Sequence, residues 1–275
     1  MSGTLFSFGF AAASAAALFF GSSPAFAQFE GRSADEVVQV SLIEGWRMEN
    51  GRHMAGIRIS LAPGWKTYWR APGDGGVPTV LRLRSAEGIE GMAIHWPAPE
   101  VFFTNGIRSI GYRDDVILPV EFAIDRGGVH HIDGRLDMGV CLDVCMPITL
   151  DLEGELLPDP ERDREIGLAL SARPLTAVEA GAGAARCSVE PISDGLRVTV
   201  TADVPPTGND ETLVLEHRDP EIWVSEATTR RTGGTVTGVA DVVPPDHGPF
   251  ALDRGDLRVT VIGTQMVVEL DGCRG

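Results

Sequence analysis

Short runs of alternating apolar and polar residues follow one another from Val37 onward, and clusters of turn residues separate them. The first block contains seven such runs, VVQVSLI, HMAGIRISL, TVLRLR, MAIHWP, VILPVEFAI, HIDGRLDM and ITLDLEGEL. The PGDGG and DRGG clusters between them are typical of turns. Strands at this spacing predict a sandwich of antiparallel sheets, so we expect an all-β fold.

A second β block follows a helical segment. ERDREIGLALSA predicts a short helix that Pro174 ends, and the AGAGAA segment at residues 180–185 predicts a flexible joint. The runs LRVTVTADV, TLVLEH, EIWVSEATT, TVTGVADVV, LRVTVIG and QMVVEL then predict a second, smaller β-sandwich without a recognisable catalytic motif. The predicted division is a first domain at residues 28–157, a helix and linker at 158–184 and a second domain at 185–275.

The N-terminus has the pattern of an export signal. Residues 1–27 contain no charged side chain and end in Ala25-Phe26-Ala27, the small-x-small pattern of a signal-peptidase site. Because the basic region of a signal peptide is missing, a retained N-terminal anchor is the alternative. No later run reaches the ~18 apolar residues of a membrane span. We therefore expect an exported periplasmic protein, whose cysteines are kept oxidised unless something reduces them.

The charge balance excludes some partners. The chain has 39 acidic and 23 basic side chains, a net charge of −16. Nucleic acids and anionic lipids require clustered positive charge, so neither is expected as a partner. Lysine occurs once, at Lys66, and we interpret this as compositional bias.

Two of the four cysteines, Cys187 and Cys273, flank the second block. The first and last strands of an antiparallel sandwich are often neighbours, so these residues predict a structural disulfide across a long loop. By loop entropy such a bond contributes on the order of 4 kcal/mol, less any strain. Two unrelated free thiols are the alternative.

The other pair, Cys141 and Cys145, requires a tight loop. Residues four apart in a strand are ~13 Å distant, far beyond the reach of a disulfide. A bridge across three residues gains little loop entropy, so it stabilises weakly and is easily reduced. The spacing leaves three interpretations open: a redox pair, a structural bridge, and a metal site. A copper(I) site would use the thioethers of Met138 and Met146 beside both thiols.

Four motifs in order carry a resemblance to a known family. They are GWKTYWRAPGDGGVPT at residues 64–79, HWPAP at 95–99, GYRDDVILPV at 111–120 and CLDVCMP at 141–147. Over about residues 37–152 the chain resembles the N-terminal periplasmic domain of the thiol:disulfide interchange protein DsbD, in its copper-sensitivity suppressor branch. The resemblance implies an immunoglobulin-like sandwich whose cysteine pair exchanges thiols and disulfides without a cofactor.

The resemblance also implies site residues. Cys145 would form mixed disulfides and Cys141 would resolve them. An aromatic lid would shield the pair, and the matching stretch, residues 100–106, offers Phe103 or its neighbour Phe102, although adjacent phenylalanines are more often core. Tyr68 and Tyr112 would line the site or simply pack in strands. Asp143 would repel thiolate charge, or only hydrogen-bond its own backbone.

Full-length family members continue into a membrane electron carrier and a thioredoxin-like domain, which residues up to Gly275 do not include. The expected partners are therefore a separate membrane-embedded thiol reductant and periplasmic thioredoxin-like proteins. The leading hypothesis is a thiol–disulfide relay that resembles a protein-disulfide reductase. A periplasmic copper(I)-binding or delivery protein and a two-domain structural or adhesion protein are the alternatives. The sequence does not identify the reductant, the client, the oligomeric state or the role of the second domain.

Overall fold

The computed structural model describes residues 33–275 except 86, 105, 126–127, 159–160 and 249. The predicted signal segment, residues 1–27, lies outside the described residues. Ala34–Gly275 forms one compact unit. Among the described residues, no helix is both long and apolar enough to cross a membrane.

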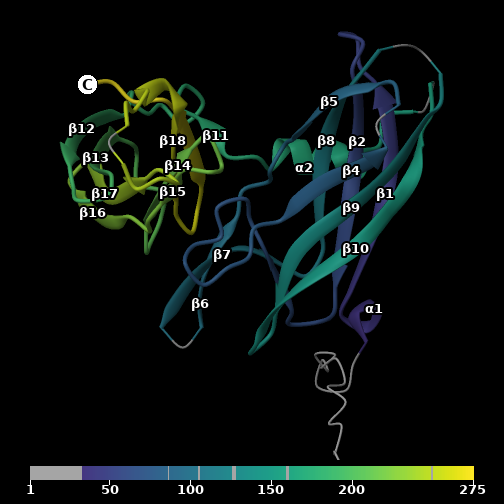
Figure 1. Ribbon diagram of the computed structural model, residues 1–275, viewed down its shortest axis with the longest axis horizontal. Coiled ribbons are helices and arrows are strands. Elements are labelled where there is room, and N and C mark those ends of the chain that lie inside the picture. Colours follow the sequence, from purple (N-terminus) through teal and green to yellow (C-terminus); the bar gives the residue numbers. More distant parts are fainter. Residues whose placement is uncertain (1–32, 86, 105, 126–127, 159–160, 249) are drawn as a thin grey trace, which may run out of the picture. The chain divides into compact units, whose positions relative to one another are not determined.

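The first block consists of two antiparallel sheets preceded by the short helix α1 (Ala34–Val37) (Figure 1). One sheet has the order β1-β2-β8-β5 and comprises β1 (Val38–Arg47), β2 (His53–Leu61), β8 (Val116–Ile124) and β5 (Ile89–Ile94). The other has the order β10-β9-β3-β7-β6, with β4 also paired to β9. It comprises β10 (Cys145–Leu156), β9 (His130–Cys141), β3 (Lys66–Tyr68), β7 (Ile107–Arg113), β6 (Glu100–Thr104) and β4 (Val80–Ser85).

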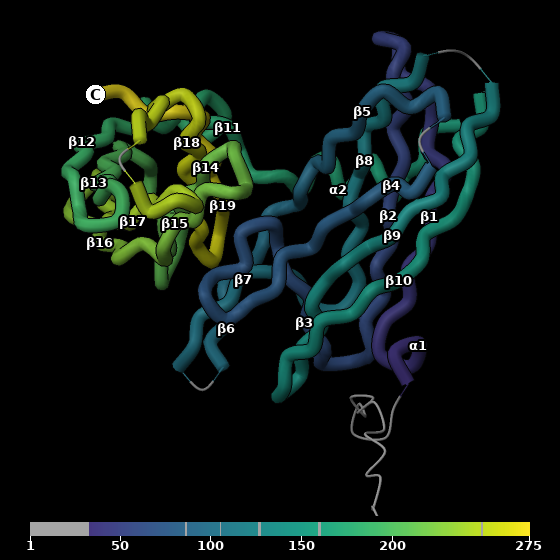
Figure 2. Tube along the Cα trace, in the orientation of Figure 1, coloured from purple at the N-terminus to yellow at the C-terminus, as the bar shows by residue number. Residues whose placement is uncertain are grey.

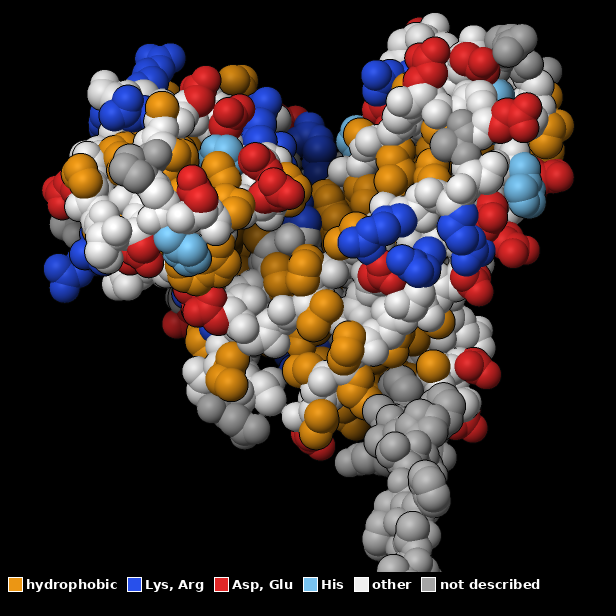
Figure 3. All heavy atoms as spheres, viewed as in Figure 1, with side chains coloured by type: hydrophobic (Ala, Val, Ile, Leu, Met, Phe, Trp, Pro, Cys, Tyr) orange, Lys and Arg blue, Asp and Glu red, His pale blue; other side chains and the backbone are white. Residues whose placement is uncertain are grey.

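Alternation along β9 separates a core face from an outer face. Ile132, Leu136, Met138 and Val140 are buried at every second position, whereas Arg135 between them is exposed. Successive side chains of a strand point to opposite faces, so the even-numbered residues of β9 face the core. The outer face of β9, β10 and β4 instead carries ion pairs such as Arg82–Asp137 and Arg84–Asp133. Basic and acidic side chains stand together over these strands in Figure 3.

Helix α2 (Arg164–Ser171) covers part of the other sheet. The carboxylate of Asp163 caps it by accepting hydrogen bonds from the backbone N–H groups of Glu165 and Ile166. Ile166 is fully buried against Trp46 and Met54. This packing explains why β2 is buried on both faces from His53 to Ile57.

The second block also has two sheets around one core. One has the order β11-β19-β18-β14, from β11 (Leu175–Thr176), β19 (Val267–Asp271), β18 (Leu257–Ile262) and β14 (Thr212–His217). The other has the order β12-β13-β17-β15, with β16 also paired to β17. It comprises β12 (Arg186–Pro191), β13 (Leu196–Asp203), β17 (Thr235–Val243), β15 (Trp223–Val224) and β16 (Thr228–Thr232). A 3-10 turn, η1 (Arg254–Asp256), precedes β18. The predicted all-β fold class is therefore confirmed.

The structure differs from the sequence prediction in several segments. Strands β3, β6, β7 and β12 were not expected, and the stretch predicted as a lid loop is strand β6 of a hairpin. The linker contains β11, which pairs in parallel with β19. The predicted flexible joint is hydrogen-bonded, since the Gly183 N–H donates to the Asp203 carbonyl and Ala185 is buried. The proposed domain boundaries remain a prediction, because Ala34–Gly275 is one compact unit.

Candidate functional site

Cys141 and Cys145 form a disulfide at the turn of the β9–β10 hairpin. The two residues are direct cross-strand partners, and their Cα atoms lie 4.1 Å apart. The turn Leu142-Asp143-Val144 reverses the chain between them. The tight loop that the four-residue spacing requires is therefore a hairpin turn.

The strand register places this disulfide on the outer face of its sheet. Lys66 of β3 lies opposite Cys141, so the two side chains share a face. Tyr68 projects to the same face, two residues further along β3. Figure 2 shows β3 between β9 and β7 at the end of the sheet where the hairpin turns.

Tyr68 contacts the disulfide directly. Its hydroxyl donates a hydrogen bond to Cys145 Sγ at 2.8 Å and lies 3.4 Å from the Gly75 carbonyl oxygen. The side chain is only 2% exposed. Burial raises the pKa of Tyr68, so its hydroxyl stays protonated and remains a donor at physiological pH.

Two glycines make room for the Tyr68 ring. A Cβ atom at Gly139 would lie 2.6 Å from Tyr68 Cε2, and one at Gly76 would lie 2.9 Å from Tyr68 Cδ1. Neither position accepts a side chain without a shift of its neighbours. The ring is thus held between the β9 backbone and the loop of residues 72–78.

The two sulfur-bearing residues differ in access. Cys141 is 3% exposed, whereas Cys145 is exposed at the start of β10. The neighbouring Val144 is also exposed, and apolar side chains gather near this turn (Figure 3). An incoming thiolate can therefore reach Cys145 more easily than Cys141.

Lys66 adds a buried positive charge to the disulfide-bearing face. Its ammonium donates a hydrogen bond of 3.0 Å to Thr104 Oγ1 and lies 5.3 Å from the centroid of the Phe102 ring. Burial lowers the pKa of Lys66, the nearby Arg113 lowers it further, and Asp143 acts in the opposite direction. Asp143 itself is exposed in the hairpin turn.

The two candidate lid residues lie in different environments. Phe102 is 3% exposed on the disulfide-bearing face, where the guanidinium of Arg113 lies 4.4 Å from its ring centroid. Phe103 projects to the opposite face and is 66% exposed. Since consecutive strand residues point to opposite faces, only Phe102 lies on the side of the disulfide. The lid itself stays a prediction, and the strand register favours Phe102 over Phe103 as its aromatic residue.

Tyr112 does not line the cysteine site. It pairs with Thr67, whose cross-strand partner on the other side is Val140, so it lies on the core face. Its hydroxyl donates a hydrogen bond of 2.9 Å to the Pro97 carbonyl. Burial raises its pKa well above the usual value. Tyr112 is therefore a packing residue.

The proposed copper ligands do not converge. Met146 pairs with Val140 and Met138 pairs with Ile148, so both thioethers lie on the core face of the hairpin. Cys141 and Cys145 lie on the outer face. Met138 is also fully buried in the core. The donor set predicted for copper(I) is therefore split between two faces of the sheet, and these residues do not fit a common metal site.

The second disulfide lies in the second β block. Cys187 of β12 and Cys273 form a disulfide with Cα atoms 5.7 Å apart. Cys187 is 5% exposed and belongs to the core of the second block. Backbone hydrogen bonds surround the pair, including one from the Cys187 N–H to the Arg274 carbonyl. This disulfide joins the first strand of the second block to the C-terminal end.

Two features of the site were missed from the sequence. Lys66 was interpreted as compositional bias, yet it is buried beside the disulfide strand. Gly139, two residues before Cys141, was given no role. A signal was available for Lys66, because residues 66 and 68 of a strand share a face. No sequence signal indicates that Tyr68 crosses over Gly139.

Comparisons with known proteins found one family model and a solved structure that match the chain. Residues 34–155 match the family model described as thiol:disulfide interchange protein DsbD, N-terminal, so the resemblance stated above is confirmed. The crystal structure of the N-terminal periplasmic domain of ScsB from Proteus mirabilis matches with a TM-score of 0.64 and 23% sequence identity. The match covers 89% of this chain and 96% of that one, so the shared fold includes both β blocks. No curated protein matches the chain.

Proposed function

Because residues 34–155 match the N-terminal family of the thiol:disulfide interchange protein DsbD, we propose that this protein is a thiol–disulfide relay working through Cys141 and Cys145. The observation that carries the proposal is the asymmetry of the pair. Cys145 is exposed and accepts a hydrogen bond from Tyr68, whereas Cys141 is buried behind it. A purely structural bridge has no need of such an arrangement.

The exchange proceeds in two transfers. A thiolate of a reduced donor attacks Cys145 Sγ, the Cys141–Cys145 bond breaks, and Cys141 leaves as a thiolate. The second thiol of the donor then attacks the donor sulfur of the mixed disulfide. The donor becomes a disulfide, and both cysteines of this protein are reduced by its two electrons.

The client is reduced by the same chemistry in the other direction. The Cys145 thiolate attacks a client disulfide and forms a mixed disulfide with it. Cys141 then attacks Cys145 Sγ, which restores the internal disulfide and releases the client as a dithiol. Tyr68 favours both transfers, since its hydroxyl stabilises a negative charge on the sulfur of Cys145.

The proposed setting is the periplasm, after cleavage of the signal segment. The donor is a membrane-embedded thiol reductant and the clients are thioredoxin-like proteins. Support comes from the family match and from the net charge of −16, which disfavours nucleic acid as a partner. Cys187–Cys273 is proposed as a structural bridge of the second block. Phe102 is proposed to shield the redox pair. Asp143 is proposed to disfavour the thiolate forms of the two cysteines by like-charge repulsion.

Mixed-disulfide trapping tests the relay. A reduced Cys141→Ala variant is mixed with a client probe, a thioredoxin that keeps one active-site cysteine, activated as a mixed disulfide with thionitrobenzoate, and the products are separated without reductant. We expect a stable mixed disulfide, because Cys145 can attack but nothing resolves the product. A Cys145→Ala variant should form little complex, since Cys141 is buried. Equal amounts of complex from both variants, or none from either, would contradict the relay.

A methionine control separates the relay from the copper alternative. A variant with Met138→Leu and Met146→Leu keeps apolar volume on the core face of the hairpin. We expect its exchange with thioredoxin to match that of the unmodified protein. Tight copper(I) binding that both methionine changes abolish would instead favour a metal-delivery protein. A Cys141–Cys145 bond that resists reduction would favour a structural protein.

A further inference from the structure

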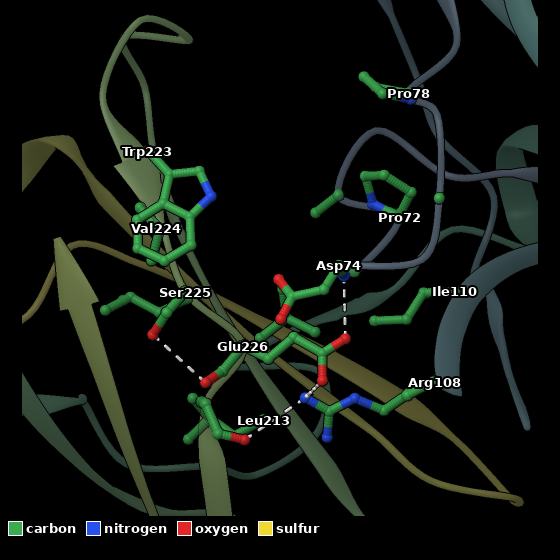
Figure 4. Close-up of a pocket in the computed structure, with 16 residues that line it drawn as sticks. Pro72, Asp74, Pro78, Arg108, Ile110, Leu213, Trp223, Val224, Ser225 and Glu226 are labelled. Atoms are coloured by element: carbon green, nitrogen blue, oxygen red, sulfur yellow. Dashed lines mark hydrogen bonds and ion pairs between the residues drawn. The ribbon is translucent and has the colours of Figure 1, made fainter. Parts of the chain in front are cut away.

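The second β block reaches the loop that precedes β4. Glu226 lies between β15 and β16, and its carboxylate accepts a hydrogen bond of 3.0 Å from the backbone N–H of Asp74. The other carboxylate oxygen pairs with Arg108 of β7 at 2.8 Å. Figure 4 shows Glu226 between Asp74 and Arg108, at the wall of a cavity of about 540 Å³.

The fit between Glu226 and this loop is close. Gly73 has φ of +80°, and a Cβ atom there would lie 2.7 Å from Glu226 Oε1. A Cβ atom at Gly75 would lie 2.5 Å from Ile107 Cγ2. The loop backbone therefore lies directly against the Glu226 carboxylate on one side and β7 on the other.

The same loop contacts the redox site through Tyr68. The Tyr68 hydroxyl lies 3.4 Å from the Gly75 carbonyl and 2.8 Å from Cys145 Sγ. The Tyr68 ring also packs on Gly76. Direct contacts thus run from Glu226 to the Asp74 N–H, through Gly75 to the Tyr68 hydroxyl, and on to Cys145.

We propose that Glu226 is a positioning residue by which the second β block holds this loop and, through it, the Tyr68 hydroxyl against Cys145. The proposal rests on the proposed function and gives a role to the second block. When the carboxylate is lost, the loop is no longer fixed at Asp74. The Tyr68 hydroxyl then spends less time on the sulfur, and the Cys145 thiolate is less stabilised.

The experiment measures the reactivity of reduced Cys145 with a small probe. Cys141→Ala is the background, so that Cys145 is the single thiol of the pair, and Cys187–Cys273 stays oxidised. The rate of reaction with iodoacetamide is followed against pH. Glu226→Ala removes the acceptor of the Asp74 N–H. It should slow the reaction at neutral pH by roughly 3- to 10-fold, the factor expected from the loss of one hydrogen bond, and should move the midpoint of the profile to higher pH.

Two comparisons make the test specific. In a Tyr68→Phe background, Glu226→Ala should have no further effect, because it acts through the Tyr68 hydroxyl. Glu216→Ala is the matched control: Glu216 also belongs to the second block and pairs with Arg70 of the first block at 2.8 Å, outside residues 72–78. Glu216→Ala should leave the rate unchanged.

Three outcomes would overturn the inference. Glu226→Ala could leave the rate unchanged, it could slow the Tyr68→Phe variant equally, or Glu216→Ala could slow the reaction as much as Glu226→Ala. The free energy of unfolding of each variant, measured in parallel, identifies general loss of structure, which also counts against the inference. Failure of the relay would be seen in the thioredoxin trapping experiment. The alkylation experiment does not depend on it, because alkylation requires no client.

Discussion

The ring of Tyr68 lies directly over Gly139, and a Cβ atom at Gly139 would come within 2.6 Å of it. This contact joins two motifs that lie about 70 residues apart in the sequence. Glycine at 139 lets the tyrosine cross β9 and reach Cys145 on the neighbouring strand β10. The glycine before the cysteine pair is therefore part of the site, although it has no chemistry of its own.

Tyr68→Phe should make reduced Cys145 a weaker nucleophile at neutral pH. The substitution keeps the buried ring but removes the hydroxyl that donates to the sulfur. A hydrogen bond to a charged group contributes about 1.5–3 kcal/mol, so the thiolate is less populated and alkylation should slow by roughly 10-fold or more. The rate of alkylation against pH, measured in the Cys141→Ala background, checks this.

Tyr112→Phe is the matched control for that prediction. Tyr112 is also buried, but its hydroxyl donates to the Pro97 carbonyl on the other face of the sheet. Its replacement should lower the free energy of unfolding by about 1–3 kcal/mol. It should not change the rate of Cys145 alkylation at any pH. Equal slowing by the two substitutions would show that the profile reports stability and not the hydrogen bond to Cys145.

Graded reduction should open the two disulfides one after the other. Cys145 is exposed, whereas Cys187 is buried in the core of the second block. Cys187–Cys273 also closes a much longer loop, so its opening returns more entropy to the unfolded chain and destabilises the fold more. Glutathione should therefore reduce Cys141–Cys145 first. Mass mapping of alkylated cysteines at increasing glutathione concentration checks the order, and simultaneous opening of both bonds would contradict it.

The sequence predicted the geometry of the Cys141–Cys145 pair better than that of its surroundings. Four-residue spacing forces Cys141 and Cys145 into a tight turn, and the family motifs indicated Tyr68 beside them. The sequence could not decide between Phe102 and Phe103, because Glu100–Thr104 was taken as a loop, in which no face can be assigned. Once that stretch is a strand, alternation alone places Phe102 on the disulfide-bearing face.

The alternation of apolar and polar residues predicted most of the strands. It failed where strand pairing or burial overrides the local sequence pattern. Strand β3 has three residues, too few for a period to be recognised. Strand β11 has two residues in a segment that reads as linker, and it exists because β19 pairs with it. The runs that were predicted correctly, such as Leu196–Asp203, alternate over a longer stretch with one buried face.

Phe102→Ala and Phe103→Ala should differ in their effects on stability and on the rate of disulfide exchange. Phe102 is buried beneath Lys66 and Arg113, so its truncation should cost about 3–5 kcal/mol and expose the disulfide-bearing face. Exchange of Cys141–Cys145 with glutathione should then become faster. Phe103 is exposed, so its truncation should change stability by less than about 0.5 kcal/mol. Unfolding by denaturant and the exchange rate check both. Equal exchange rates in the two variants would remove Phe102 as a shield.

The second block should lose stability in acid through Glu211. Burial acts to raise the pKa of this carboxyl, but hydrogen bonds from Arg231 and from Thr207 outweigh it, and the pKa falls below the ordinary 4.5. A lowered folded-state pKa stabilises the fold above the unfolded pKa, and this stability is lost as pH falls through the folded pKa. Glu211→Gln should therefore cost about 1.5–3 kcal/mol at neutral pH, and the difference from the unmodified protein should shrink as the pH falls below 4.5. The free energy of unfolding of both proteins is measured with denaturant at a series of pH values. The difference between them isolates the contribution of Glu211, because both proteins share all other carboxyls. A difference that stays constant across that pH range would show that the carboxyl gains nothing from Arg231 in the folded state.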